Sequence, residues 1–246
     1  MKTCLIFQPC GIGDIIWIQP IVDKFINMGY KVYHPVIDLY YDMVANQIKK
    51  DNLMWVKESD SFPLKEHYGL EHPHITDNEL YIPISHSWKY LKNCSVMIGK
   101  YFFTNTPITN WHKNIQILRN FEKENRVFEV YGIDKTKPFT LSNMSYGTPP
   151  NSIKRNIAVP VKTNQHIEMS FEVDQKNNIQ LFDWIGAIEM ASEIFTVETS
   201  TCFLADMYAK TETLHMYERK PDNSPPIFYN LTNKIYRNPN WTYEII

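Results

Sequence analysis

The first 36 residues alternate strand, helix and strand, and this stretch constrains the fold more than any other. Residues 3–8 form an apolar run that predicts a buried strand. In residues 14–28, apolar side chains recur every three or four positions, which predicts a helix, and residues 31–36 predict the next strand. A strand, a helix and a second strand make a βαβ unit, so we expect an α/β fold with a parallel sheet.

The α/β pattern continues with a helix at residues 39–49, a long loop at 59–77 and a helix at 111–130. Residues 139–155 are rich in Pro, Gly, Ser, Thr and Asn, which predicts a linker. After it the pattern restarts, with strands at 157–161, 194–197 and 213–217 and helices at 179–191 and 201–209. We therefore expect two α/β domains, residues 1–138 and 156–246, joined by the linker and facing one another across a cleft.

Composition excludes several classes of function. A formal net charge of -2 and a pI near 6.4 give no overall attraction to polyanions, so nucleic acid would need a local basic patch. The four cysteines, Cys4, Cys10, Cys94 and Cys202, lack the CxxC spacing of zinc sites, and we expect a reducing compartment such as the cytoplasm. No run resembles a signal peptide or approaches the ~18 apolar residues of a membrane span.

The first candidate motif is Cys10-Gly11-Ile12-Gly13-Asp14, where the first strand passes into the first helix. Gly11 and Gly13 permit a tight turn and a close backbone approach. Asp14 lies at or near the helix N-cap, where a carboxylate is worth roughly 1 kcal/mol. It also lies beyond the carboxyl end of a parallel strand, where it could act as a general base. A dinucleotide site fits poorly, because the third glycine is missing and a carboxylate would repel a pyrophosphate.

The second motif, Glu198-Thr199-Ser200-Thr201, lies between the predicted strand 194–197 and the next helix. Hydroxyl side chains and free N–H groups at a helix N-terminus suit a phosphate. The same residues would also serve as ordinary caps. Glu198 could accept hydrogen bonds from sugar or ribose hydroxyls, or be a solvated loop acid.

The third candidate is Lys162-Thr163, which follows the predicted strand 157–161. At a strand end, an ammonium group and a hydroxyl could neutralise charge on a leaving phosphate. A solvated surface lysine is the alternative.

Two segments resemble the family 9 glycosyltransferases, the ADP-heptose:lipopolysaccharide heptosyltransferase group. Residues 11–32, GIGDIIWIQPIVDKFINMGYKV, are similar to the family's opening, with its Gly-Asp turn, early proline (Pro20) and Gly-Tyr-x-Val strand entry. Residues 181–210, LFDWIGAIEMASEIFTVETSTCFLADMYAK, are similar to its C-terminal segment. There Glu198 replaces an aspartate, Ser200 a glycine and Phe203 a histidine.

The resemblance implies a GT-B-like fold of two Rossmann-like halves, with the acceptor bound by the first and the nucleotide-sugar donor by the second. It implies an inverting transfer without metal or cofactor to a hydroxyl on a glycan or lipopolysaccharide-like acceptor. Asp14 would be the catalytic base, with Gly11 and Gly13 on the acceptor side. The donor would be bound by Lys162, Thr163, Glu198, Thr199, Ser200 and Thr201.

Two alternatives stay open. One is a phage or viral enzyme that glycosylates hydroxymethylated DNA bases, with a local basic surface drawn from Lys49-Lys50, Lys89, Lys92 and Trp111-His112-Lys113. The other is a non-catalytic α/β module that binds a nucleotide or a glycan.

Overall fold

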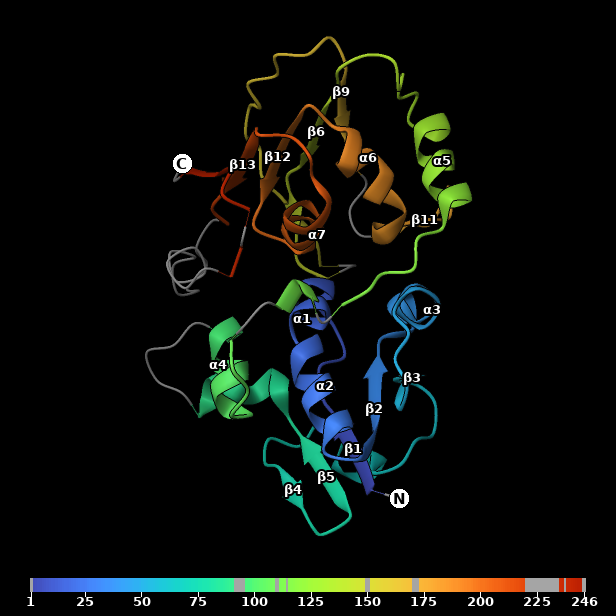
Figure 1. The fold of residues 1–246 in the computed structure, drawn as a ribbon, viewed down its shortest axis with the longest axis vertical. Coiled ribbons are helices and arrows are strands. Elements are labelled where there is room, and N and C mark those ends of the chain that lie inside the picture. The colour runs from blue at the N-terminus through green and yellow to red at the C-terminus, as the bar shows by residue number, and fades with distance from the viewer. Residues whose placement is uncertain are drawn as a thin grey trace. The chain divides into compact units, whose positions relative to one another are not determined.

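Strand β1 (Lys2–Ile6) lies in the middle of the first of two five-stranded sheets in the computed structural model (Figure 1). The structure describes residues 2–90, 96–108, 111–113, 115–148, 151–169, 173–219, 235–236 and 238–244. They divide into two units, Met1–Leu118 and Arg119–Ile246.

The first unit contains a mainly parallel sheet with the order β3-β2-β1-β5-β4. Its other strands are β2 (Tyr30–Val36), β3 (Leu53–Lys57), β4 (His74–Ile75) and β5 (Glu79–Ile82). In this sheet the β4–β5 pair is antiparallel, and the β1–β2, β1–β5 and β2–β3 pairs are parallel. The predicted βαβ opening is therefore confirmed.

The helices of this unit are α1 (Ile12–Trp17), α2 (Gln19–Asn27), α3 (Asp38–Gln47) and α4 (Val96–Phe103), with 3-10 turns η1 (Lys65–His67), η2 (Ile84–Lys89) and η3 (Trp111–Lys113). The single helix predicted over residues 14–28 is two helices that meet at Ile18. Pro20 has no N–H to donate to the carbonyl of Ile16, which removes a helical hydrogen bond at this point. The predicted loop 59–77 contains η1 and β4, and it buries Phe62 and Leu64 against β1 and β5.

The second unit contains a fully parallel sheet with the order β14-β13-β12-β6-β9. Its strands are β6 (Thr140–Asn143), β9 (His166–Glu168), β12 (Glu193–Val197), β13 (Leu214–Tyr217) and β14 (Trp241–Glu244). The helices are α5 (Phe121–Val130), α6 (Ile185–Met190) and α7 (Ser200–Tyr208), preceded at α6 by the 3-10 turn η4 (Leu181–Trp184). Two small antiparallel pairs join β7 (Ser145–Tyr146) to β8 (Ile153–Lys154) and β10 (Val173–Asp174) to β11 (Ile179–Gln180).

The division between the units lies between Leu118 and Arg119, whereas the sequence predicts a first domain of residues 1–138 and a linker at 139–155. Residues 139–155 contain β6, which is fully buried and pairs with both β12 and β9, as well as β7 and β8. The sequence of β6 is TLSN, in which leucine is the one large apolar residue. Because a buried strand is normally recognised by a run of apolar residues, β6 could not be recognised from its sequence. Residues 149 and 150 lie outside the described part of the chain.

Residues 157–161 form no strand, contrary to the sequence prediction. Ile157 and Val159 nevertheless pack against the buried cluster formed by Met144, Tyr146, Phe195, Val197 and Tyr217. The alternating apolar pattern therefore marks a segment whose side chains are packed, but whose backbone does not pair with the sheet. The predicted helix 111–130 is likewise reduced to η3 and α5.

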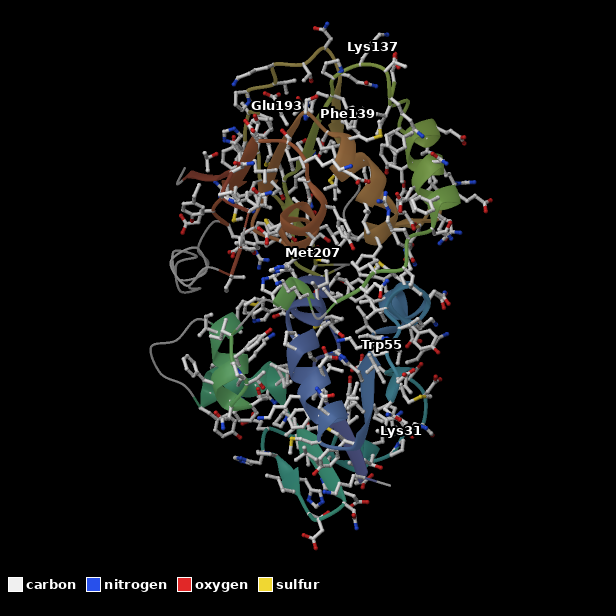
Figure 2. All side chains as sticks on the ribbon, in the orientation of Figure 1. Lys31, Trp55, Lys137, Phe139, Glu193 and Met207 are labelled. Atoms are coloured by element: carbon white, nitrogen blue, oxygen red, sulfur yellow. The ribbon has the colours of Figure 1, made fainter. Side chains whose placement is uncertain are left out.

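His34, in β2, is a fully buried histidine of the first sheet. Its Nε2 lies 3.0 Å from the backbone oxygen of Gln8, and because a carbonyl only accepts, Nε2 carries the proton. Its ring stacks on Trp55 of β3 (labelled in Figure 2), with 4.7 Å between ring centroids. Burial is the main cause that lowers the pKa of His34 to about 4, with a smaller contribution from Lys100.

Replacing His34 by Gln should remove part of the acid sensitivity of the fold. Between the ordinary pKa of 6.5 and about 4, the unfolded chain binds a proton at His34 that the folded chain does not, so stability falls as the pH falls. When the pH falls from 6.5 to 4.5, the titration of His34 lowers the free energy of unfolding by about 2 kcal/mol. Gln keeps an N–H donor and does not titrate, so urea unfolding at the two pH values should show a smaller loss for the variant. Equal losses of stability in the wild type and the variant would contradict the lowered pKa of His34.

Candidate functional site

Asp14 is the third residue of α1, beyond the carboxyl end of β1. The N-cap is Gly11, which adopts the left-handed conformation with φ 77°, and no side chain caps this helix. The sequence placed Asp14 at or near the cap, and the structure places it inside the first turn. There its carboxylate still interacts favourably with the positive end of the helix dipole.

The Asp14 carboxylate has a buried counterion, Lys100 of α4. Lys100 Nζ pairs with Asp14 Oδ1 and donates to Gln8 Oε1 at 2.7 Å. The Lys100 side chain is 2% exposed and the Asp14 side chain 30% exposed, so only the carboxylate of this pair reaches solvent. Sequence reasoning missed Lys100. The signal in the sequence was a lone lysine within the apolar helix VMIGKYFF.

Among the described residues, hydrogen bonds of Trp17 and Tyr101 hold helix α4 against the end of α1. Trp17 Nε1 donates to the backbone oxygen of Met97 at 2.8 Å, and Tyr101 Oη donates to the backbone oxygen of Trp17 at 2.6 Å. Both side chains are fully buried, and their rings lie 4.8 Å apart. These contacts fix the position of Lys100 relative to α1.

Gly11→Ala should destabilise the fold more than Gly29→Ala. Both glycines have positive φ, 77° and 85°, where an L side chain costs roughly 1–2 kcal/mol. A Cβ at Gly29 meets no atom within 4 Å, whereas one at Gly11 would lie 2.5 Å from Asp14 Oδ2. Because Lys100 holds this carboxylate, we expect Gly11→Ala to cost about 1 kcal/mol more in urea unfolding. If both substitutions cost the same, the carboxylate is not held in place.

In the second unit, Glu198 and Thr199 lie between β12 and α7, and Ser200 and Thr201 are the first two residues of α7; all four are buried. Thr199 is the N-cap of α7, and no side chain caps the helix. Thr201 Oγ1 accepts a hydrogen bond of 2.6 Å from Asn143 Nδ2, at the carboxyl end of β6. The motif is therefore attached to two neighbouring parallel strands.

Within the described part of the chain, Glu198 has partners that the sequence did not predict. Tyr236 Oη donates to Glu198 Oε1 at 3.3 Å, and Arg219 Nε donates to the backbone oxygen of Glu198. Burial and the neighbouring Glu198 carboxylate raise the pKa of Tyr236 well above its ordinary value, so Tyr236 donates as a neutral hydroxyl.

Two arginines lie near this carboxyl edge of the sheet. The guanidinium of Arg219 lies 5.5 Å from the centre of the Tyr146 ring. Arg155 donates from a terminal guanidinium nitrogen to the backbone oxygen of Glu218, directly after β13. The region around α7's first turn therefore has nearby cationic side chains, although neither is the lysine that the sequence analysis selected.

Lys162 and Thr163 lie at the opposite, amino edge of this sheet. Glu193 Oε2 accepts from the backbone N–H of Lys162 at 3.2 Å, and Thr163 Oγ1 lies 2.7 Å from Thr140 Oγ1. Glu193 (labelled in Figure 2) and Thr140 are the first residues of β12 and β6. Five residues of strand, roughly 16 Å, separate Glu193 from Glu198. The structure does not bring Lys162 and Thr163 together with the Glu198–Thr201 motif.

Two of the basic residues that favoured a DNA acceptor are paired with acidic side chains. Lys50 Nζ lies 2.6 Å from Asp23 Oδ1, and Lys89 pairs with Glu71. Trp111 is 1% exposed, so its ring is not available to stack on a base. Lys92 lies outside the described residues.

An open hollow of about 580 Å³ lies beside α3 and the start of β3 in the first unit. Its lining includes Tyr41, Lys49, Lys50, Asp51 and Trp55. Because β3 is parallel to β2 and β1, this hollow lies at the amino edge of the sheet and Asp14 at the carboxyl edge. In the described parts of the chain, no three His, Cys, Asp or Glu residues are arranged to hold a metal ion, and no helix is long and apolar enough to cross a bilayer.

No protein-family model matches the sequence, and no curated protein matches it. Among solved structures, the chain is similar to a family 9 glycosyl transferase from Veillonella parvula DSM 2008, with a TM-score of 0.55 and 9% identity over 100% of this chain and 86% of that one. It also matches the iron-containing dodecameric glycosyltransferase TibC of enterotoxigenic E. coli H10407, with a TM-score of 0.47 and 6% identity over 88% and 58% of the two chains. For E. coli ADP-heptose lps heptosyltransferase II, the TM-score is 0.45 and the identity 8%, over 99% and 90%.

The similarity to the Veillonella structure shows the fold. The chain is similar in its α/β fold to that family 9 glycosyl transferase, and the resemblance predicted from residues 11–32 and 181–210 is confirmed at this level. The predicted fold class, α/β with two mainly parallel sheets, is confirmed as well, and it is consistent with a GT-B-like fold; the cleft expected between the two halves stays a prediction.

Proposed function

We propose that this protein is an inverting glycosyltransferase that moves a sugar from a nucleoside-diphosphate donor to an acceptor hydroxyl. The observation that carries the proposal is the Asp14 carboxylate, which is partly exposed at the carboxyl edge of the first sheet and paired with a buried lysine. In α/β proteins with parallel strands, ligands bind at this edge. The shared fold with a family 9 glycosyl transferase adds support.

Asp14 would act as the general base. It takes the proton from the acceptor hydroxyl as that oxygen attacks the anomeric carbon of the donor from the face opposite the diphosphate. The new bond joins the acceptor oxygen to the anomeric carbon, and the bond from that carbon to the phosphate oxygen breaks. The diphosphate leaves with the electron pair, so the configuration inverts. General-base assistance contributes about 10²–10⁴-fold in rate.

The first turn of α7 would hold the departing diphosphate. Backbone N–H groups at a helix N-terminus and the helix dipole favour an anion. Arg219 and Arg155 would supply positive charge near this edge, in place of Lys162. Glu198 would accept hydrogen bonds from hydroxyls of the ribose or the sugar. We propose that these groups make a metal ion unnecessary for leaving-group departure.

The acceptor we propose is a hydroxyl on a glycan or lipopolysaccharide-like molecule. The paired lysines and the buried Trp111 give no support to a DNA acceptor. The non-catalytic alternative is tested directly by the substitution at Asp14.

Asp14→Asn should abolish most transfer and keep donor binding. A thermal-shift screen with UDP, GDP, ADP and TDP sugars identifies the donor, because a ligand at 100 times its Kd adds about 2.7 kcal/mol of stability. With that donor, release of nucleoside diphosphate should fall at least ~100-fold in the variant, since the amide cannot take a proton. The control is Asp23→Asn, which breaks another partly exposed aspartate–lysine pair of the same unit. Wild-type turnover by Asp14→Asn would refute the proposed mechanism.

Arg219→Gln and Thr199→Ala should weaken binding of the nucleoside diphosphate, and Lys162→Ala should not. We expect calorimetric Kd values to rise about tenfold for each of the first two, because each removes a group near the first turn of α7. Lys162 is exposed at the other edge of the sheet and serves as the control. A rise only for Lys162→Ala would move the donor site to the amino edge.

A further inference from the structure

We propose that Lys100 is the positioning residue for the catalytic base, fixing Asp14 Oδ1 so that Oδ2 is presented to the acceptor hydroxyl. This inference rests on the proposed function, because it gives Asp14 the role of base. Lys100 itself is too deeply buried to touch a substrate, with 2% of its side chain exposed. It can act on the reaction only through the carboxylate that it holds.

The two carboxylate oxygens of Asp14 have different surroundings. Oδ1 is paired with Lys100 Nζ. Oδ2 faces Gly11, where a Cβ would lie only 2.5 Å from it. The missing side chain at Gly11 therefore allows Oδ2 to lie close to the backbone at this position. Among the described residues, Lys100 bonds to Oδ1 while Oδ2 has no hydrogen-bond donor, and the Asp14 side chain is 30% exposed.

Lys100 cannot follow the carboxylate outward, because it is also tied to the interior. Its Nζ donates to Gln8 Oε1 at 2.7 Å, and Gln8 Nε2 donates to the backbone oxygen of Cys10 at 2.7 Å. The two bonds determine the orientation of the Gln8 amide, since an ammonium only donates and a carbonyl only accepts. His34 Nε2 donates to the backbone oxygen of the same Gln8. The ammonium is therefore anchored to the carboxyl end of β1.

A purely structural role for Lys100 is the main alternative, and the chain offers a matched lysine that has one. Lys24 of α2 donates to the backbone oxygens of Thr104 and Asn105, at 2.5 and 2.9 Å, directly after α4. It thus ties α2 to the same helix without reaching Asp14. If Lys100 serves only to hold α4 in place, replacing Lys100 or Lys24 should change kcat and KM in the same way.

The kinetic test compares Lys100→Met, Lys100→Gln and Lys24→Met, using the sugar nucleotide found by the thermal screen. We expect kcat to fall at least tenfold in both Lys100 variants, with the donor KM within about twofold of wild type and little change for Lys24→Met. Combining Lys100→Met with Asp14→Asn should lower kcat no further than Asp14→Asn alone, because Lys100 acts through Asp14. A further tenfold loss in the double variant, or equal losses for Lys24→Met, would overturn the proposal.

A second readout needs no activity. Ligand-free crystal structures of the wild type and of Lys100→Gln should differ at Asp14, whose side chain we expect to leave its wild-type rotamer or to occupy two. An unchanged single rotamer would overturn the positioning role. If Asp14→Asn turns over normally, the proposed function fails, and the crystal comparison still decides whether Lys100 positions this carboxylate.

Discussion

The structure of the first unit depends on the neutralisation of a buried ammonium group, that of Lys100. A charged lysine without partners inside a protein is very costly, so Lys100 requires both an anion and a neutral acceptor. Asp14 and Gln8 meet this requirement, and in doing so they connect the end of β1, the first turn of α1 and the middle of α4. Hydrogen bonds made by Trp17 and Tyr101 also join α1 to α4. Asp14, the candidate base, is therefore also the counterion that allows Lys100 to be buried.

The second unit shows why the direction of a strand matters as much as its presence. Glu198 and Lys162 both lie close to β12, but at opposite ends of it. Since parallel strands share one orientation, groups after the carboxyl ends of β6, β12 and β13 gather at one edge. Asn143, Glu198 and Arg219 meet there, whereas Thr163 lies with Thr140 and Glu193 at the other edge. Any donor site that uses α7 excludes Lys162 for this geometric reason.

Strong local patterns predicted the fold class, the β1–α1–β2 opening and the β12–α7 crossover. The failures have physical causes. Strand β6 is built from TLSN, whose polar side chains are buried through hydrogen bonds such as that between Thr140 and Glu193, so it has no apolar run. Residues 157–161 carry an alternating pattern but pack without joining the sheet. Lys100 and Arg219 could not be found by spacing, because their partners lie 86 and 21 residues away.

The pairing of Asp14 with Lys100 also affects which molecules can approach the carboxyl edge of the first sheet. An isolated carboxylate repels phosphate and carboxylate groups at long range, whereas a contact pair of opposite charges has a weak field that decays quickly with distance. If Asp14 is the base that we propose, it would contribute almost no electrostatic barrier to an anionic acceptor. Discrimination among acceptors by charge would then come from other side chains around the site, and the proposed base would be compatible with neutral and acidic sugars alike.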